Sequence, residues 1–377
     1  MSSEKALMNG RLGTHVSVLS WFSESWGFKI DSGEVTGAIG DSITVLPLVV
    51  ALGLLTPASL PHVLVGFAVF QAVWGAAYGV PLSVEPMKAL AGLAIAGSIT
   101  YGELVAAGVL AGGVLLLAGR RGWLSAISSV VGEPVVRGVQ FAVACLLLVA
   151  AIEPISATPS VAGAGVVIAA AVALVSRRAV ALVVLAIGGL WAVLTVGVPQ
   201  PAVPEFALFP AGGPVASVGA VEGVVAQLGM TVGNAAIATS LLLSDLYDAD
   251  ISADRLAESM GVMNLASVPF GALPMCHGSG GLAGKHAFGA RTGAANLVAG
   301  ILYLALALVA GVLFAFPMAL LGVLLVIVAA SLARVAFGST DRPLLVASIG
   351  GLAVLTNVGV AFVAGIAWWQ FGERLRE

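Results

Sequence analysis

Long apolar stretches alternate along the chain with short clusters of turn-forming residues. Stretches such as Val105–Ala118 and Ile301–Leu313 are almost continuously apolar. Strands of a membrane β-barrel would alternate polar and apolar positions, so these stretches predict helices surrounded by lipid. The pattern predicts an all-α polytopic membrane protein with about fourteen membrane elements. They are expected near residues 35–55, 61–79, 81–98, 103–119, 134–152, 160–175, 179–197, 215–242, 256–272, 273–290, 293–315, 317–334, 343–355 and 356–371.

Two of these elements differ from ordinary spans. The third begins with the segment VPLSVEP (80–86) and the tenth with the segment LPMCHGSGG (273–281). Both segments are polar, contain proline or glycine, and continue as a short helix. Their positions match if the chain consists of two seven-element halves, which would have opposite orientations in the membrane. Interrupted helices at matching positions of two such halves indicate a transporter's binding site.

The composition agrees with a membrane protein. Hydrophobic residues make up 59% of the 377 residues and charged residues 9%, whereas soluble domains carry about 25% charged residues. These values exclude a soluble enzyme and a disordered scaffold, and a net charge of −3 provides no basic surface for nucleic acid. The two cysteines, Cys145 and Cys276, indicate no disulfide framework.

The distribution of charged residues predicts the topology. Arginines follow the even-numbered elements, while the opposite loops carry only acidic residues such as Glu153 and Glu205. This asymmetry fits the positive-inside rule with both termini in the cytoplasm. Residues 1–32 lack the apolar core of a cleavable signal and are expected to form a cytoplasmic lead-in. We expect residues 33–377 to form a single transmembrane unit, and the Ala- and Val-rich composition favours a prokaryotic plasma (inner) membrane.

The two interrupted elements provide the candidate binding chemistry. A helix that begins inside the membrane presents unpaired N–H groups and a partial positive charge. Two such helix starts facing each other form an anion site that needs no metal or cofactor. No catalytic residue is expected. The substrate-binding residues are expected to be Ser83, Glu85, Pro86, Lys88, Gln227, Asn234, His277, Gly278, Ser279 and Gly280.

Other polar residues in the spans have more than one interpretation. Gln227, Thr231 and Asn234 share one face of the eighth element, which indicates either a site-lining stripe or interhelical hydrogen bonds. Lys285 either belongs to the site or extends to the cytoplasmic interface, and glycine-rich segments also serve helix packing. The candidates for proton coupling are the carboxyl groups in or near the spans, because buried carboxyl groups can titrate near neutral pH. They are Glu85, Glu222 and Asp41.

Five segments resemble the molybdate transporter family of plants and microbes, a branch related to the SulP sulfate permeases. They are Gly37–Leu52, Tyr78–Ala91, Pro134–Phe141, Gln227–Thr239 and Met260–Gly293, whose PMCHGSGGLAG sequence is the most specific. The resemblance implies an inverted repeat like that of uracil and sulfate permeases, without a STAS domain. It also implies a core domain (33–119 and 215–315) that moves against a gate domain (134–197 and 317–371).

The chain departs from the family pattern at two positions. Glu85 stands where the family usually has glutamine, and Gly229 stands where it usually has proline. An ionised carboxylate at position 85 would repel a dianion. Glu85 is therefore expected to become protonated when substrate binds, to pair with Lys88, or to indicate a substrate other than molybdate.

Together these observations predict a secondary active transporter for a tetrahedral oxyanion, molybdate or sulfate, with proton symport and alternating access. A passive anion channel, or a carrier of bicarbonate or a nucleobase on the same fold, is the alternative. An enzyme lacks support because no HExxH or GxSxG motif lies in any span. The expected partners are a small inorganic oxyanion, protons and the lipid bilayer, with a homodimer as one candidate assembly and no nucleic acid.

Overall fold

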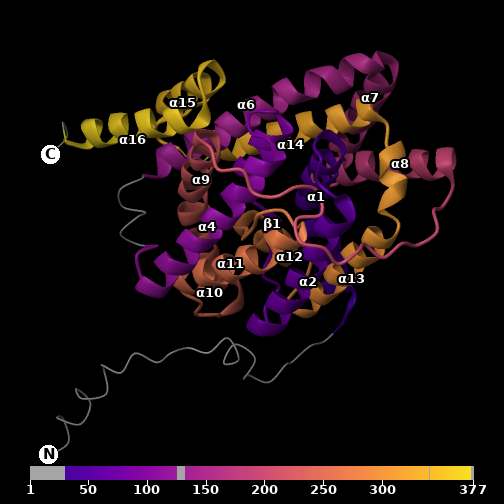
Figure 1. Ribbon diagram of the computed structural model, residues 1–377, viewed down its shortest axis with the longest axis horizontal. Helices are drawn as coiled ribbons and strands as arrows, with labels where there is room; N and C mark the ends of the chain where they lie inside the picture. The colour runs from indigo at the N-terminus through magenta and orange to yellow at the C-terminus, as the bar shows by residue number, and fades with distance from the viewer. Residues whose placement is uncertain (1–29, 125–131, 339, 375–377) are drawn as a thin grey trace, which may run out of the picture.

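The computed structural model describes residues 30–124, 132–338 and 340–374, which are mainly helical (Figure 1). The lead-in expected over residues 1–32 lies outside this range except for residues 30–32. The first half contains α1 (Ser32–Leu55), α2 (Leu60–Tyr78), α3 (Lys88–Ile95), α4 (Tyr101–Arg121), α6 (Glu133–Ala157), α7 (Pro159–Val175) and α8 (Val180–Val196).

The second half begins with α9 (Val218–Met230), which continues through a π-helical stretch, η2 (Thr231–Ala238), into α10 (Thr239–Tyr247). It then contains α11 (Ala253–Ser267), α12 (Ser279–Ala287), α13 (Ala294–Leu308), α14 (Met318–Gly338), α15 (Pro343–Leu355) and α16 (Val358–Arg374). Short 3₁₀ turns, η3 (Val268–Phe270) and η4 (Ala310–Ala315), follow α11 and α13. These helices overlap the segments expected from hydropathy, and the total number of membrane elements stays a prediction.

Local sequence explains where several helices begin. The Asp31 side chain accepts hydrogen bonds from the backbone N–H groups of Gly33 (2.8 Å) and Glu34 (3.1 Å) at the start of α1. Thr100 and Glu103 form a reciprocal capping box at the start of α4. Proline occupies the first turn of α2, α6, α7 and α15. These residues satisfy or remove backbone N–H groups that have no acceptor within the helix.

The two halves repeat the same helix contacts. Helix α2 packs against α13, and their counterparts in the other half, α11 and α4, pack against each other. In the same way α1 packs against α12, and α9 packs against α3. The architecture is therefore the inverted repeat that the spacing of the two interrupted elements predicts.

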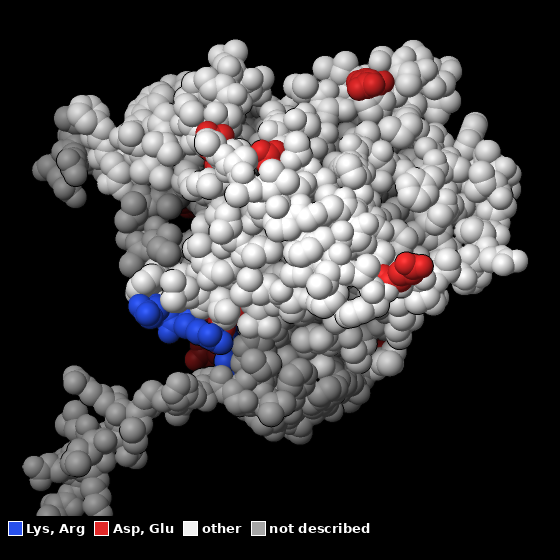
Figure 2. Space-filling view, in the orientation of Figure 1, with Lys and Arg blue, Asp and Glu red and all other residues white. Residues whose placement is uncertain are grey.

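The outer surface of the molecule suits contact with lipid. Six described helices are long and apolar enough to cross a membrane, by length and composition. On two of the shorter helices, Leu174 of α7 is 90% exposed and Leu355 of α15 is 83% exposed. Figure 2 shows a face with few charged groups, on which Lys and Arg gather at one edge. An apolar surface of this extent is unsuited to water and favourable in a bilayer.

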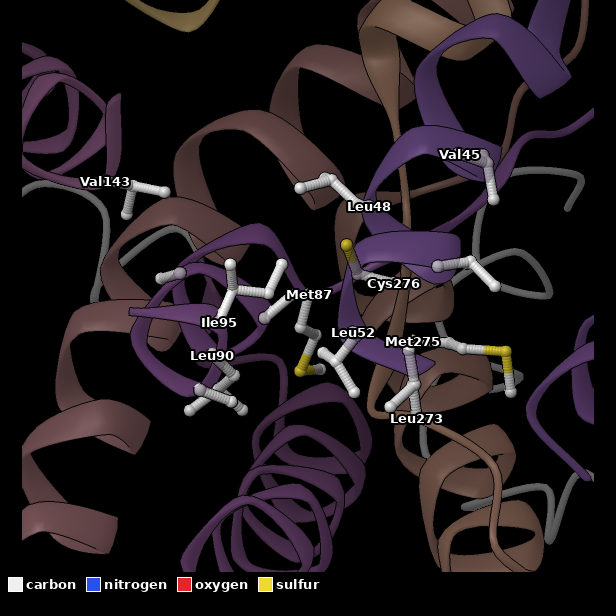
Figure 3. Close-up of a cluster of buried hydrophobic side chains, with 14 of the residues drawn as sticks. Val45, Leu48, Leu52, Met87, Leu90, Ile95, Val143, Leu273, Met275 and Cys276 are labelled. Carbon is white, nitrogen blue, oxygen red and sulfur yellow. The ribbon is translucent and has the colours of Figure 1, made fainter. Parts of the chain in front are cut away.

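The interior between the halves is filled by apolar side chains around two short strands, β1 (Val84–Pro86) and β2 (Met275–His277). Figure 3 shows Leu48 and Leu52 of α1, Met87 and Leu90 at the start of α3, and Met275 of β2. All five side chains are buried. This packing fixes the interrupted elements in the middle of the molecule.

Replacing Gly261 of α11 with alanine is expected to destabilise the protein. A Cβ atom there would lie 2.5 Å from the backbone nitrogen of Leu116 on α4, which cannot move without shifting the helix. We expect a loss of about 1–3 kcal/mol in the free energy of unfolding, measured as a lower melting temperature in detergent. Gly113→Ala on α4 is the control, because no atom lies within 4 Å of a Cβ there. Equal melting temperatures for the two variants would contradict the tight contact between α4 and α11.

Candidate functional site

The two interrupted elements meet head to head. Strands β1 and β2 pair in antiparallel orientation, with Val84 opposite His277, Glu85 opposite Cys276 and Pro86 opposite Met275. The backbone N–H of Met87 continues the ladder by donating to Pro274 O at 2.8 Å. Each strand leads into a short helix, α3 or α12, so two helix starts flank this two-stranded ribbon. The predicted meeting of two half-helices is therefore present.

Four charged side chains form a cluster beside the ribbon. The Lys285 Nζ atom lies 3.1 Å from Asp41 Oδ2, and both residues are fully buried. Lys88 pairs with Glu85, three residues earlier, and Glu85 is 1% exposed while Lys88 is 18% exposed. Ser83 lies between the two acids: its hydroxyl is 2.6 Å from Asp41 Oδ1 and 3.3 Å from Glu85 Oε1. Two positive and two negative charges balance within this cluster, which limits the penalty for burying them.

Lys285 belongs to the interior and does not extend to the interface. Besides Asp41, its ammonium group donates to Asn296 Oδ1 (2.8 Å), Gln71 Oε1 (3.1 Å) and Leu82 O (3.3 Å). The interpretation that Lys285 reaches the cytoplasmic surface is therefore wrong. Its partners come from α1, α2, α13 and the segment before β1, so one ammonium group joins four parts of the chain.

A side-chain oxygen caps each half-helix. The carboxylate of Glu85 accepts a hydrogen bond from Gly281 N at the start of α12 (2.9 Å). The Gln227 amide oxygen accepts from Ala89 N (2.9 Å) and Leu90 N (3.4 Å) at the start of α3. A helix N-terminus favours negative charge and acceptor groups. The protein's own side chains therefore already occupy part of the expected anion cradle.

Glycines at and just before the start of α12 make room for this arrangement. A Cβ atom at Gly278 would lie 2.0 Å from Glu85 Oε1, and a Cβ atom at Gly281 would lie 2.2 Å from Ser83 Oγ. No atom lies within 4 Å of a Cβ built at Gly280. The glycines at 278 and 281 thus allow the carboxylate to approach the helix start, while Gly280 borders open space.

The remaining expected donors are engaged within the protein. His277 Nδ1 lies 3.1 Å from the carbonyl oxygen of Ser83, which can only accept, so this nitrogen carries a proton. The other ring nitrogen lies 2.8 Å from Ser259 Oγ. Ser279 donates to Asn234 Oδ1 at 2.5 Å. In this conformation the hydrogen bonds of His277 and Ser279 hold β2 and the start of α12 against the neighbouring segments.

The polar stripe of the eighth element faces inward as predicted. Gln227 and Thr231 are buried, and the Gln227 amide nitrogen donates to Thr231 Oγ1 at 2.9 Å. The stripe forms interhelical hydrogen bonds, and these bonds reach the half-helices: Gln227 contacts the start of α3 and Asn234 contacts Ser279 of α12. Glu222 is not brought to the cluster, since its side chain packs beside Gly359 of α16.

Several residues of the site were missed by sequence analysis. Gln71 and Asn296 accept hydrogen bonds from Lys285. Ser259 forms a hydrogen bond with His277. Asn264 forms hydrogen bonds with both the N–H and the C=O of Met275, each at 2.7 Å. The available signal was a single amide or hydroxyl in an otherwise apolar helix, which is unfavourable in lipid unless it has a partner. That signal identifies inward-facing residues but not their partners.

A cavity of about 600 Å³ reaches the starts of the two half-helices. Lys88 and Gly280 line it together with residues of α1, α12, α8 and α14. Among the described residues, no acceptor takes the N–H groups of Ser279 and Gly280 at the start of α12. Within that same described part of the chain, no group of three or more His, Cys, Asp and Glu is arranged to hold a metal ion. The cavity thus offers one ammonium group and a helix start to an anion.

The fold is that of solved anion transporters. The transmembrane domain of a cyanobacterial bicarbonate transporter, BicA, matches with a TM-score of 0.61 and 19% identity, over 89% of this chain and 97% of that chain. The murine Solute Carrier 26 family member A9 anion transporter, in its inward-facing state, gives 0.66 and 13% identity over 95% and 70%. The predicted fold class, like that of uracil and sulfate permeases, is confirmed.

The sequence comparisons identify the family. A family model described as "Molybdate transporter of MFS superfamily" matches residues 33–147 and 219–332, one segment in each half. Molybdate transporter 2 of Arabidopsis thaliana is 30% identical over 366 residues, covering 80% of this chain and 78% of that protein. Molybdate transporter 1 of the same plant is 29% identical over 402 residues, covering 90% and 87%. These names confirm the prediction of a transporter rather than an enzyme, and the chain belongs to the molybdate transporter family.

Proposed function

We propose that the protein is a secondary active transporter that carries molybdate, with sulfate as a second substrate, through the plasma membrane. The observation that carries this proposal is the pair of half-helix starts, with Lys88, at the inner end of a cavity. Opposed helix starts and an ammonium group suit a tetrahedral dianion. The names of the Arabidopsis relatives favour molybdate.

The substrate is proposed to enter from the cavity and to bind at the start of α12. The Lys88 ammonium group supplies the charge, and the N–H groups of Ser279 and Gly280 supply donors. Ser83, Gln227, Asn234 and His277 hold these elements in position through the bonds described above, rather than contacting the anion in this conformation. The residues expected to bind substrate thus divide into contacting and positioning groups.

Glu85 is the proposed proton-coupling group. Its carboxylate accepts from Gly281 N–H at this helix start and pairs with Lys88, the ammonium group that the oxyanion also needs. Protonation removes the negative charge and releases Lys88, so the proton and the anion bind together. Asp41 is held by Lys285, Ser83 and Gln71, and Glu222 lies beside α16. Both are therefore weaker candidates than Glu85.

Alternating access is proposed to occur by movement of a core domain against a gate domain. The core would comprise α1–α4 and α9–α13, and the gate α6–α8 and α14–α16. In support, α6 packs against α14 and α15, whereas α4 packs against α11 and α2 against α13. The cavity lies along the boundary, between α1 and α12 on one side and α8 and α14 on the other. We further propose that both termini are cytoplasmic, which is the orientation that the arginine distribution favours.

Lys88→Met is expected to reduce molybdate uptake into proteoliposomes at least about tenfold, because the charge that balances the dianion is lost. Arg137→Gln is the control, since Arg137 pairs with Glu133 on α6 and does not line the cavity. Uptake is measured with labelled molybdate, and tungstate and sulfate are added as competitors. Unchanged uptake by Lys88→Met would overturn the site. Transport of bicarbonate or uracil by a protein that takes up no molybdate would overturn the proposal that molybdate is the substrate.

Glu85→Gln is expected to remove the dependence of uptake on a proton gradient while molybdate still binds. In the unmodified protein, uptake and affinity should rise as pH falls, because protonated Glu85 no longer competes with the anion. The variant should show a flat pH profile, measured by uptake with and without an imposed gradient. Glu222→Gln should behave like the unmodified protein. If Glu85→Gln keeps the full dependence on the proton gradient, Glu85 is not the coupling group. If uptake by all three proteins is insensitive to the proton gradient, the result favours a channel.

Lys285→Met is expected to destabilise the fold by about 3–5 kcal/mol, because Asp41 would remain as an unpaired buried charge. The double variant Asp41→Asn with Lys285→Met removes both charges and should recover most of the lost stability. Melting temperatures in detergent provide the measurement. If the double variant is no more stable than Lys285→Met, the two side chains are not coupled as described.

A further inference from the structure

The cavity described above extends well beyond the half-helix site. One wall is formed by Gly40 and Thr44 of α1 and by Ala283 and Ala287 of α12. The opposite wall is formed by the end of α7, the start of α8 and the second half of α14. In terms of the domains proposed here, one wall belongs to the core and the other to the gate.

Every charged residue that lines this cavity is positive. Lys88 lies at its inner end, and Arg177, Arg178 and Arg334 line it on the gate side. The segments that carry these arginines, residues 159–198 and 317–338, contain no Asp or Glu. Besides Lys88, which is paired with Glu85, the cavity is therefore lined by three arginines and by no acidic residue, and a lining of one sign raises the local concentration of anions.

The three arginines have no partner within the described part of the chain. No hydrogen bond or ion pair joins Arg177, Arg178 or Arg334 to any described residue, and all three are exposed. Other arginines are used differently: Arg120 pairs with Glu258 at 3.4 Å, and Arg137 pairs with Glu133 at 3.0 Å. Charges left unpaired around a cavity are available to an anionic ligand.

We propose that Arg177, Arg178 and Arg334 form a second anion-binding station, which holds the dianionic oxyanion on its way between solvent and the half-helix site. This inference rests on the proposed function. A guanidinium group presents paired N–H donors that match two oxygens of a tetrahedral anion. The station lies on the gate, whereas Lys88 and Gly280 lie on the core. Movement of the gate against the core therefore changes the distance between the three arginines and the half-helix site.

The test replaces all three arginines with glutamine in the full-length protein. Molybdate transport is measured in proteoliposomes from the face on which the arginines lie, as a function of molybdate and salt concentration. We expect KM to rise about fivefold to tenfold, kcat to change less than about twofold, and the decrease of transport with added salt to become shallower. The matching lysine triple variant keeps the charge and should retain most of the affinity. Arg120→Gln is the control, because Arg120 does not line the cavity.

The outcomes separate this inference from the proposed function. If the unmodified protein transports no oxyanion, the proposed function fails. If it transports molybdate and the glutamine variant keeps the same KM and salt dependence, only the second station is refuted. Liposomes with and without anionic phospholipid distinguish the source of the anion, because an effect seen only with anionic lipid would assign the arginines to headgroups and refute the station. If the triple variant does not reconstitute, Arg334→Gln is measured in its place with the same criteria.

Discussion

The rest of the structure depends on the neutralisation of four charges in an apolar interior. Asp41, Glu85, Lys88 and Lys285 come from three helices and one strand, in three separate parts of the chain, yet each charge has an opposite partner. Removing Asp41, Lys88 or Lys285 would leave its partner as an uncompensated buried charge. Their mutual pairing therefore requires α1, β1, α3 and α12 to meet in one arrangement, which also brings the two half-helix starts together.

The two crossovers are alike in backbone and different in chemistry. In the ribbon Glu85 lies opposite Cys276, so only one of the paired strands presents an acid at this register. The helix starts differ in the same way: a carboxylate caps α12 and a neutral amide caps α3. An anion approaching the ribbon thus meets a protonatable group on one side and a fixed neutral acceptor on the other. The two half-helix starts have the same backbone arrangement, and Glu85 on one strand makes their chemistry differ.

Hydropathy was sufficient to predict where the apolar helices lie, because lipid imposes length and composition on each helix. The polar, Pro- and Gly-containing segments predicted the two interruptions. The meeting of the two interruptions also followed from their symmetric positions, whereas the strand pairing of Val84 with His277 appears only in the structure. Sequence could not show which groups fill the helix starts, since Gln227 and Ala89 are far apart along the chain and many polar residues compete for that place. Lys285 was ambiguous for the same reason: its burial depends on Gln71 and Asn296, whose roles appear only when α2 and α13 pack together.

The close fit between Glu85 and the glycines of α12 also constrains how this protein can evolve. A Cβ atom at position 278 would overlap the Glu85 carboxylate, and one at position 281 would overlap Ser83, Asp41 and Glu85, so these polar side chains are compatible only with bare backbone opposite them. A methyl group at position 278 requires a shorter residue at 85, whereas one at position 281 also requires changes at Ser83 and Asp41. We therefore expect positions 41, 83, 85, 278 and 281 to be constrained together among relatives, as one inherited unit rather than independent sites.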